Sequence, residues 1–463
     1  MINHRFASAT KLVPIGVFLA CQACGGRLAP VTMVPARALG RDLPVYQPAP
    51  AAAGRPEVAF EHPTGAVSLR DAIALALLRS PDLAAFAWET RAREARLLQA
   101  GGMPNPVVAV LAEDLNASGS SSGGSGAVQV VQPQTTVQLS QLVELGGKRT
   151  ARQNLAAFDR DLAAWDYEAT RMEVLTRVTH AFIDVLAAQE MLELTAQTTQ
   201  LGEEVRQRVG ARVVAGVVSP IEETRAGVAL ASARVESDRA VRLLDASRAR
   251  LAAHWGASEA TFQSAVGDLD LISELPTMTA LTSRLAQNPD LARWAAEISQ
   301  REAAIEIEQA ARVPDLTLTA GYRRFSDIGG SALVIGGSIS LPVFDRNRGG
   351  TEEARSRLAK AHEERRAAEA RVSAELAEGY RALASAYEEV TALRSSILPG
   401  ARQNFEAVSE GYRLGRFGYL DVLDVQRTSI AAAGQYLRAL SDYHKAVADV
   451  ERLIGTPLAE IVN

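Results

Sequence analysis

Two aspartates close to the C-terminal end of the chain form the most suggestive chemical pair in the sequence. Asp421 and Asp424 are three residues apart, so on a helix their carboxylates lie on one face. Carboxylates gathered along a narrow passage concentrate cations and repel anions. An ordinary solvated helix face shows the same spacing, and spacing alone favours that simpler interpretation. The choice between the two depends on the elements that position the pair.

Other reactive side chains are not grouped in a way that predicts catalysis or metal binding. The six histidines are scattered along the chain, and the methionines form no thioether cluster suited to copper. We therefore predict no catalytic residues, no bound metal, no cofactor and no enzymatic activity. A net charge of −5, with Lys and Arg dispersed along the chain, argues against nucleic acid as a partner.

The N-terminal residues predict export. Residues 1–20 combine a basic start with an apolar run too short to span a bilayer, as in a signal peptide. Cys21 follows where a bacterial lipobox places its lipidated cysteine; the alternative is ordinary cleavage nearby, for example before Gly25. Cys21 and Cys24 are the only cysteines, so the mature chain has no disulfide framework. Residues 21–66, rich in Pro and Ala, predict an extended leader.

Beyond this leader the chain repeats itself. The Ser-Pro-Asp-Leu sequence at 80–83 returns as Asn-Pro-Asp-Leu at 288–291, and the glycine turn at Gly216 returns at Gly415. Both offsets are about 200 residues, far too long for a solenoid unit. The chain therefore predicts two equivalent halves. Their expected bounds are residues 67–256 and 277–457.

Alternating hydrophobicity predicts one β-hairpin in each half. The expected strands are 107–111 and 128–143 in the first half, and 316–322 and 333–341 in the second. Four strands cannot close a membrane barrel alone, since known barrels begin at about eight. This mismatch is the strongest physical indication that several copies assemble.

Long helices fill the rest of each half. Residues 67–100 predict a helix broken at the Ser-Pro pair, and 148–210 and 349–398 predict long helices with a heptad-like apolar seam. Return helices are expected over 219–255 and 418–454. At 1.5 Å per residue the longest helix would extend for about 90 Å, which suits a bundle or a tube better than one compact core.

Together these features resemble the TolC family of outer-membrane efflux channels, in its heavy-metal (CzcC/CusC-like) branch, over about residues 67–457. The strand-to-helix junctions carry the resemblance to the branch, with Glu-Leu-Gly-Gly-Lys-Arg at 144–149 and Leu-Pro-Val-Phe-Asp-Arg-Asn-Arg-Gly-Gly at 341–350. The glycine pairs at 146–147 and 349–350 are expected to let the chain turn sharply, and the basic residues to lie near the membrane edge. The assigned junction residues are Gly146, Gly147, Lys148, Arg149, Pro342, Arg346 and Gly349.

The resemblance implies an α+β membrane protein that works as a homotrimer. Four strands from each protomer would form a twelve-stranded outer-membrane β-barrel, continued by a long α-helical tube in the periplasm. The implied function is a passive channel of a tripartite RND-type efflux system, exporting heavy-metal cations with a periplasmic adaptor and an inner-membrane pump as partners. The alternatives are a multidrug or type I secretion duct and, less favoured, a periplasmic coiled-coil adaptor tethered by lipid on Cys21.

The resemblance also assigns a periplasmic gate. Tyr412 falls on the gate tyrosine, and Asp421 and Asp424 fall on two constriction carboxylates, which threefold symmetry would turn into stacked acidic rings. Glu222 falls on the acidic residue that ties neighbouring gate helices together. Its usual arginine partner is absent, because Phe417 stands at that position.

Either Arg413 or Arg416 would have to substitute for that arginine, or the closed state would rely on packing. The two glycine turns resemble tips that dock an adaptor; the alternative is a helical hairpin turn that simply needs glycine after the helix C-terminus. The residues assigned to docking are Arg212, Gly216, Val217, Gly415 and Arg416.

Overall fold

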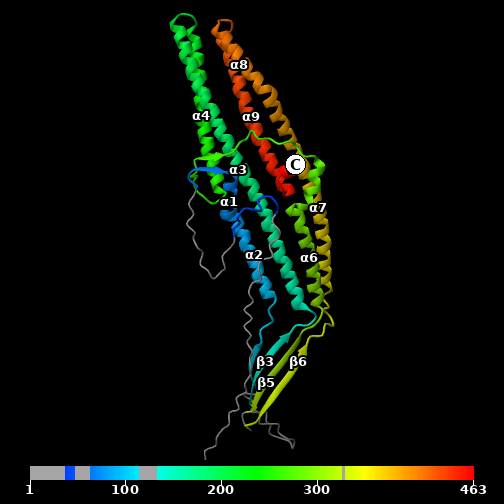
Figure 1. Cartoon of the computed structure of the whole chain (residues 1–463). Coiled ribbons are helices and arrows are strands. Elements are labelled where there is room, and N and C mark those ends of the chain that lie inside the picture. Colours follow the sequence, from blue (N-terminus) through cyan, green and yellow to red (C-terminus); the bar gives the residue numbers. More distant parts are fainter. Residues whose placement is uncertain (1–36, 47–62, 114–132, 326–328, 463) are drawn as a thin grey trace, which may run out of the picture.

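The molecule is elongated, with a β-sheet at one end, two helical hairpin tips at the other and long helices between them (Figure 1). This computed structural model describes residues 37–46, 63–113, 133–325 and 329–462. The C-terminus lies midway along the molecule (Figure 1). We call the level of residues 454–462 the waist. The expected signal peptide, Cys21 and most of the leader lie outside the described residues.

The sheet contains four antiparallel strands in the order β2-β3-β5-β6. The strands are β2 (Val107–Glu113), β3 (Gln134–Val143), β5 (Leu316–Phe325) and β6 (Ser331–Ile339). The two predicted hairpins are therefore confirmed, and β3 pairs with β5 so that Val137 lies opposite Tyr322. The expected extension of the second strand over 128–132 falls outside the described residues, and Leu341 lies beyond the end of β6.

Short helices lead into each hairpin. In the first half α1 (Leu69–Arg79) and α2 (Pro81–Ala100) meet at the predicted Ser-Pro break. Ser68 caps α1 through its hydroxyl, which accepts a hydrogen bond from the Asp71 amide, while the Asp71 carboxylate accepts one from the Ser68 amide. The second half follows the same plan with α5 (Met278–Arg284), a 3₁₀ turn η1 (Leu285–Gln287) and α6 (Pro289–Ala310).

The first long hairpin is formed by α3 (Lys148–Val214) and α4 (Pro220–Ala253). The 67 residues of α3 extend for about 100 Å. Its predicted apolar seam is confirmed at the waist, where Met172, Leu175 and Val178 are almost fully buried. Nearer the sheet, small residues such as Ala156 and Ala163 occupy the buried positions, and there α3 packs between α2 and α6.

The second long hairpin is not a continuous copy of the first. Instead of one helix over 349–398, the structure has α7 (Arg348–Ala392), a π-helical turn η2 (Leu393–Ile397) and α8 (Leu398–Arg413). Pro399 accounts for this turn, because its ring would collide with the carbonyl one turn earlier in a regular α-helix, and widening the helix by one residue makes room for the ring. The return helix is α9 (Tyr419–Ile454).

A small parallel ladder at the waist was not predicted. Strand β1 (Ala66–Ser68) pairs with β4 (Ser264–Val266), so the start of the first half contacts the segment that links the halves. The largest hydrophobic cluster lies at this level and combines α1, α3, α4, α7 and α9. A final short helix, α10 (Ala459–Val462), ends the described chain. Within the described ranges, none of the helices combines the length and hydropathy needed to cross a membrane.

Candidate functional site

The two hairpin tips are closed by the same backbone motif. After α3, Gly216 adopts a left-handed conformation with φ of 71°, and Val217 N–H donates to the Arg212 carbonyl over 2.9 Å. After α8, Gly415 has φ of 72°, and Arg416 N–H donates to the Gly411 carbonyl over 2.8 Å. This pattern satisfies carbonyls that a helix end leaves unpaired, and it requires a residue without a Cβ strain penalty at its centre. The predicted hairpin turns are therefore present at both sites.

A compact apolar cluster joins the two hairpins just below their tips. Tyr419, the first residue of α9, is only 2% exposed and packs with Val209 of α3, Ala226 of α4 and Leu423 of α9. Tyr412 of α8 packs at the edge of this cluster, with its ring centroid 6.0 Å from that of Tyr419. The contribution of Tyr419 was not predicted from the sequence, although an aromatic residue at a helix start beside a glycine turn is a usable signal.

Tyr412 makes polar contacts with both helices of the first hairpin. Its hydroxyl donates to Glu222 Oε2 over 3.5 Å, and the Arg212 guanidinium lies over its ring, 4.6 Å from the centroid. Burial raises the pKa of Tyr412 and raises that of Tyr419 to about 12, so both phenols stay protonated. The structure thus brings Tyr412 and Glu222, which were both assigned to the gate, into contact, although the sequence did not predict this pairing. It adds Arg212, which had been assigned only to the tip surface.

Neither arginine suggested as a substitute partner reaches Glu222 within the described chain. Arg413 forms an ion pair with Glu410 on its own helix at 2.6 Å. Arg416 lies exposed at the tip. Phe417 folds back over Gly411 so closely that a Cβ on that glycine would lie 2.2 Å from the ring. The cation beside Tyr412 therefore comes from the first hairpin, through Arg212, instead of from the second.

The two aspartates of the proposed constriction differ in their surroundings. Both are exposed in the first turns of α9. The Asp421 carboxylate accepts a hydrogen bond from the Gly418 amide over 2.8 Å, and so it caps the helix. Within the described ranges the Asp424 carboxylate accepts no such bond, whereas its backbone carbonyl accepts one from the Thr428 hydroxyl. Asp424 is therefore the freer of the two charges.

The tips present apolar side chains as well as charge. Val214 is 90% exposed, and Val217 and Leu414 are mostly exposed too. Arg416 is exposed on the same tip as Leu414. A surface of this kind, at the end of a rigid hairpin, is suited to contact with another protein.

The first strand-to-helix junction is tightly built. Gly146 and Gly147 both have positive φ, of 69° and 74°, as the predicted sharp turn requires. The Lys148 ammonium pairs with Asp315 Oδ1 at 2.7 Å, and the Leu145 amide donates to the same oxygen over 3.1 Å. Although burial opposes the effect, these contacts hold the pKa of Asp315 below its usual value. The Lys148 ammonium is thus held by an ion pair within the chain. Of the two neighbouring cations Lys148 and Arg149, Arg149 is the exposed one.

A second ion pair supports the same junction. The Arg152 guanidinium forms two hydrogen bonds with the Glu144 carboxylate, which lowers the pKa of Glu144. Such a two-point contact fixes the direction in which α3 leaves the sheet. The sequence motif Glu-Leu-Gly-Gly-Lys-Arg thus has a structural role in this turn.

The second junction turns at a different residue from the one predicted. Gly349 and Gly350 are helical, and the left-handed residue is Asn347, with φ of 47°. Asparagine tolerates this conformation because its short side chain can bond locally, and here Asn347 Nδ2 donates to Glu308 Oε2 over 2.6 Å. Gly350 instead permits close packing, since a Cβ there would lie 2.5 Å from Glu308 Oε2. Pro342 and Arg346 are exposed on the linker between β6 and α7.

No cluster of three or more His, Cys, Asp or Glu side chains that could hold a metal ion occurs among the described residues. His180, for example, contacts Asp449 Oδ1 and the Lys445 carbonyl, both at 3.2 Å. These contacts give the ring an ordinary structural role between α3 and α9.

Comparison with known proteins gives a consistent result. The family model described as outer membrane efflux protein matches residues 72–257 and 280–456. The cobalt-zinc-cadmium resistance protein CzcC of Cupriavidus metallidurans is 34% identical over 391 residues, which cover 84% of this chain and 90% of CzcC. The nickel-cobalt-cadmium resistance protein NccC of Alcaligenes xylosoxydans is 29% identical over 334 residues, 72% of each chain.

Solved structures agree at the level of the fold. A crystal structure of CusC superimposes with a TM-score of 0.71 at 17% identity, over 89% of this chain and 99% of CusC. The two chains thus share their overall fold. The chain belongs to the outer membrane efflux protein family.

Proposed function

We propose that this chain is the passive outer-membrane duct of a metal-cation efflux system. The tip geometry carries this proposal: Asp424 is an exposed carboxylate directly after Leu423, a member of the cluster that joins the two hairpins. In a symmetric assembly such carboxylates form a ring at the narrow end of a tube, which favours cations. The relatives CzcC and NccC are named for resistance to cobalt, zinc and cadmium and to nickel, cobalt and cadmium, and this supports metal cations as the substrate.

We further propose a homotrimer. The four-stranded sheet ends in two edge strands, β2 and β6, and both carry exposed apolar residues such as Val108, Val110 and Ile335. Unpaired edges of this kind invite pairing with another copy. Pairing of β6 in one protomer with β2 in the next, three times over, would leave no free edge. The long hairpins would then stand side by side as a tube.

The proposed partners follow from the two ends of this tube. The exposed apolar tips, with Arg416 and Val217, are the surface for a periplasmic adaptor, and the adaptor connects the tube to an inner-membrane RND pump. We propose no substrate site within the chain, because a duct of this kind leaves selection to the pump. The predicted division into two repeats, the signal peptide and lipidation of Cys21 remain predictions.

An efflux assay tests the proposal. The full chain is expressed with a metal-exporting pump and its adaptor in cells that lack the matching outer-membrane component, and cellular zinc and cadmium are measured. Restored metal export is the expected result. The same chain is also expressed with a drug-exporting pump and its adaptor; restored export of dyes in those cells, without restored metal export in the first, would favour a multidrug duct.

A fractionation experiment addresses the tethered-adaptor alternative. The Cys21→Ser variant is expressed, and membranes are washed with alkaline carbonate. An integral channel stays with the membrane fraction and migrates as a trimer in mild detergent. Release into the wash as a soluble chain would overturn the channel proposal in favour of a lipid-tethered scaffold.

A further inference from the structure

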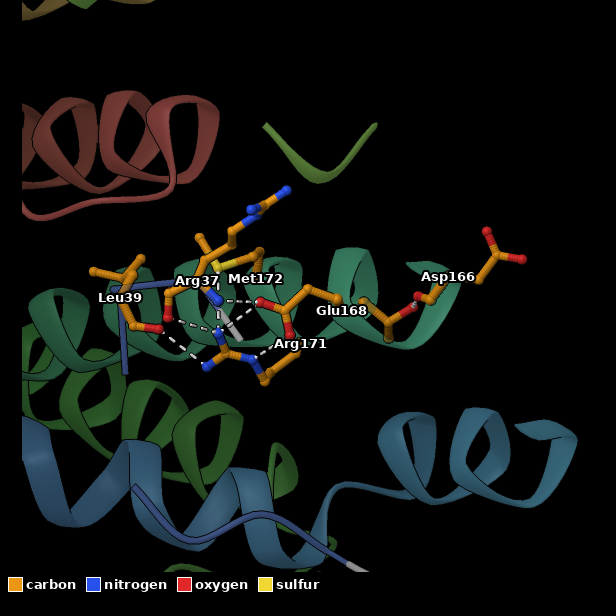
Figure 2. A network of polar contacts seen from close by, with 7 residues as sticks. Arg37, Leu39, Asp166, Glu168, Arg171 and Met172 are labelled. Carbon is orange, nitrogen blue, oxygen red and sulfur yellow. Dashed lines mark hydrogen bonds and ion pairs between the residues drawn. The ribbon is translucent and has the colours of Figure 1, made fainter. Parts of the chain in front are cut away.

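A buried charge pair on α3 has no part in the functions proposed above. Glu168 and Arg171 are one turn apart, and their side chains are only 4% and 2% exposed. Arg171 Nε donates to Glu168 Oε2 and Arg171 Nη2 to Glu168 Oε1, both over 2.8 Å (Figure 2). An ion pair buried this deeply loses its hydration and is weak evidence for stability by itself. Its remaining hydrogen-bonding capacity must be satisfied by something else.

The N-terminal segment 37–46, which we call the strap, supplies those partners through its backbone. Glu168 Oε1 accepts from the Arg37 amide over 2.8 Å. Arg171 donates to the Leu39 carbonyl over 3.0 Å and to the Arg37 carbonyl over 3.4 Å (Figure 2). The pair therefore presents both an acceptor and donors to the main chain at the start of the strap, just before its turns at residues 38–43. This is the chemistry that recognises a peptide backbone whatever its side chains are.

Side chains of the strap add selectivity to this contact. The Arg37 guanidinium lies over the Trp165 ring, 4.9 Å from its centroid. Gly40 has φ of 66°, and a Cβ there would lie 3.3 Å from Leu175, so a larger residue would be both strained and crowded. Leu39 and Leu43 pack against the waist core.

The strap also contacts elements from both halves of the chain. The Leu39 amide donates to the Gly455 carbonyl at the end of α9 over 3.3 Å, and the Tyr46 amide donates to the Leu77 carbonyl of α1 over 3.1 Å. Asp42 pairs with Arg70 of α1 at 2.9 Å. A strap bound to α3 thus bridges the first half to the C-terminal turn of the second.

We propose that Glu168 and Arg171 form a built-in receptor for the strap, and that the bound strap clasps the two halves together at the waist. The strap covers the ion pair and replaces its hydration, because the strap main chain forms hydrogen bonds with both side chains. Loss of that recognition releases the strap and loosens the turn after Gly455, while the long helices stay folded.

Hydrogen exchange on the full chain tests both parts. The charge-swapped double variant, Glu168→Arg with Arg171→Glu, can still form an ion pair. It places a carboxylate against the strap carbonyls and a guanidinium against the Arg37 amide, so neither can make the original hydrogen bonds. We expect amide exchange in residues 37–46 to become at least about tenfold faster, with helical content unchanged. Exchange at 455–458 should also accelerate.

The chain offers a matched control. Glu363 and Arg366 on α7 have the same order and spacing, with the ion pair at 2.8 Å, but both side chains are about 70% exposed. Reversing that pair should leave strap exchange unchanged. Unchanged strap exchange in the 168/171 variant would overturn the receptor, and a freed strap with unchanged exchange at 455–458 would overturn the clasp.

A second variant tests the proposal even if swapping the charges at 168 and 171 prevents folding. Arg37→Pro removes the amide that donates to Glu168 and the cation over Trp165, and it leaves every residue of α3 intact. It should release the strap to a similar extent. Full strap protection in this variant would contradict the proposal independently.

Discussion

The Tyr412 hydroxyl lies 3.5 Å from Glu222 Oε2, so a residue at the end of α8 reaches the first turn of α4 in the other hairpin. The same ring carries the Arg212 guanidinium on its face. One aromatic side chain therefore links α3, α4 and α8 just below the tips. Movement of one hairpin relative to the other has to break this link.

We predict that Arg212 contributes more to the link than the hydroxyl does. A hydrogen bond of 3.5 Å is long, whereas a cation over a partly buried ring is worth about 0.5–2 kcal/mol. Arg212→Met should raise single-channel conductance in planar bilayers, with Tyr412→Phe having a smaller effect. A double-mutant cycle with Tyr412→Leu should show coupling of that size. Arg413→Met is the control, because its pair with Glu410 is exposed and local; an equal effect there would argue against the link.

The two aspartates should separate into a structural and an electrostatic role. Asp424→Asn removes the freer charge, and we expect lower selectivity for cations over anions with unchanged stability. Asp421→Ala also removes the cap on the Gly418 amide, and it should cost about 1 kcal/mol of unfolding free energy besides its effect on selectivity. Reversal potentials in asymmetric KCl measure the first quantity, and thermal unfolding measures the second. Unchanged selectivity in the double variant would refute the constriction assignment.

Patterns with strong local causes could be predicted from the sequence. The Ser-Pro break between α1 and α2, the four strands and the glycine-centred tips all appear where expected. Each depends on a residue that restricts the backbone directly: proline, alternating apolar residues or glycine. The buried seam from Met172 to Val178 follows from helical periodicity in the same way.

Features that depend on contacts between distant residues could not be predicted in this way. Gly349 and Gly350 were expected to form the second turn, but Asn347 takes the left-handed conformation because Glu308 binds its side chain. The position of Arg212 over Tyr412 joins residues 200 apart in sequence, and no local pattern encodes it. The π turn was missed because Pro399 suggests a helix end as readily as a widened helix.

The glycines of the junctions allow these causes to be measured separately. Gly146→Ala should destabilise the chain by about 2–4 kcal/mol, since φ is positive and the new Cβ would lie 2.6 Å from Val313. Gly147→Ala has the same backbone strain with nothing within 4 Å, so it should cost only about 1–2 kcal/mol. Gly349→Ala lies in a helix with open space around it, and it should be neutral or stabilising by up to about 1 kcal/mol. Thermal unfolding of the three variants tests the order, and a large loss in Gly349→Ala would contradict the assignment of the turn to Asn347.

Stability should also depend on pH through one carboxyl group near the end of α9. Burial raises the pKa of Glu451 to about 7, although its carboxylate accepts a hydrogen bond from the Leu458 amide over 2.8 Å. A carboxyl whose pKa is higher in the folded than in the unfolded chain favours the folded state below the unfolded value of about 4.3, and this contribution is lost as pH rises toward 7.

Glu451→Gln keeps an oxygen acceptor for Leu458 and cannot ionise. Its free energy of unfolding at pH 8 should therefore exceed that of the wild type by roughly 3–4 kcal/mol, with a higher unfolding temperature, and the difference should shrink as pH falls to 5. Glu460→Gln, an exposed carboxyl on α10, is the control and should show no such trend. A difference between Glu451→Gln and the wild type that stays constant from pH 5 to 8 would mean that Glu451 does not titrate in this range.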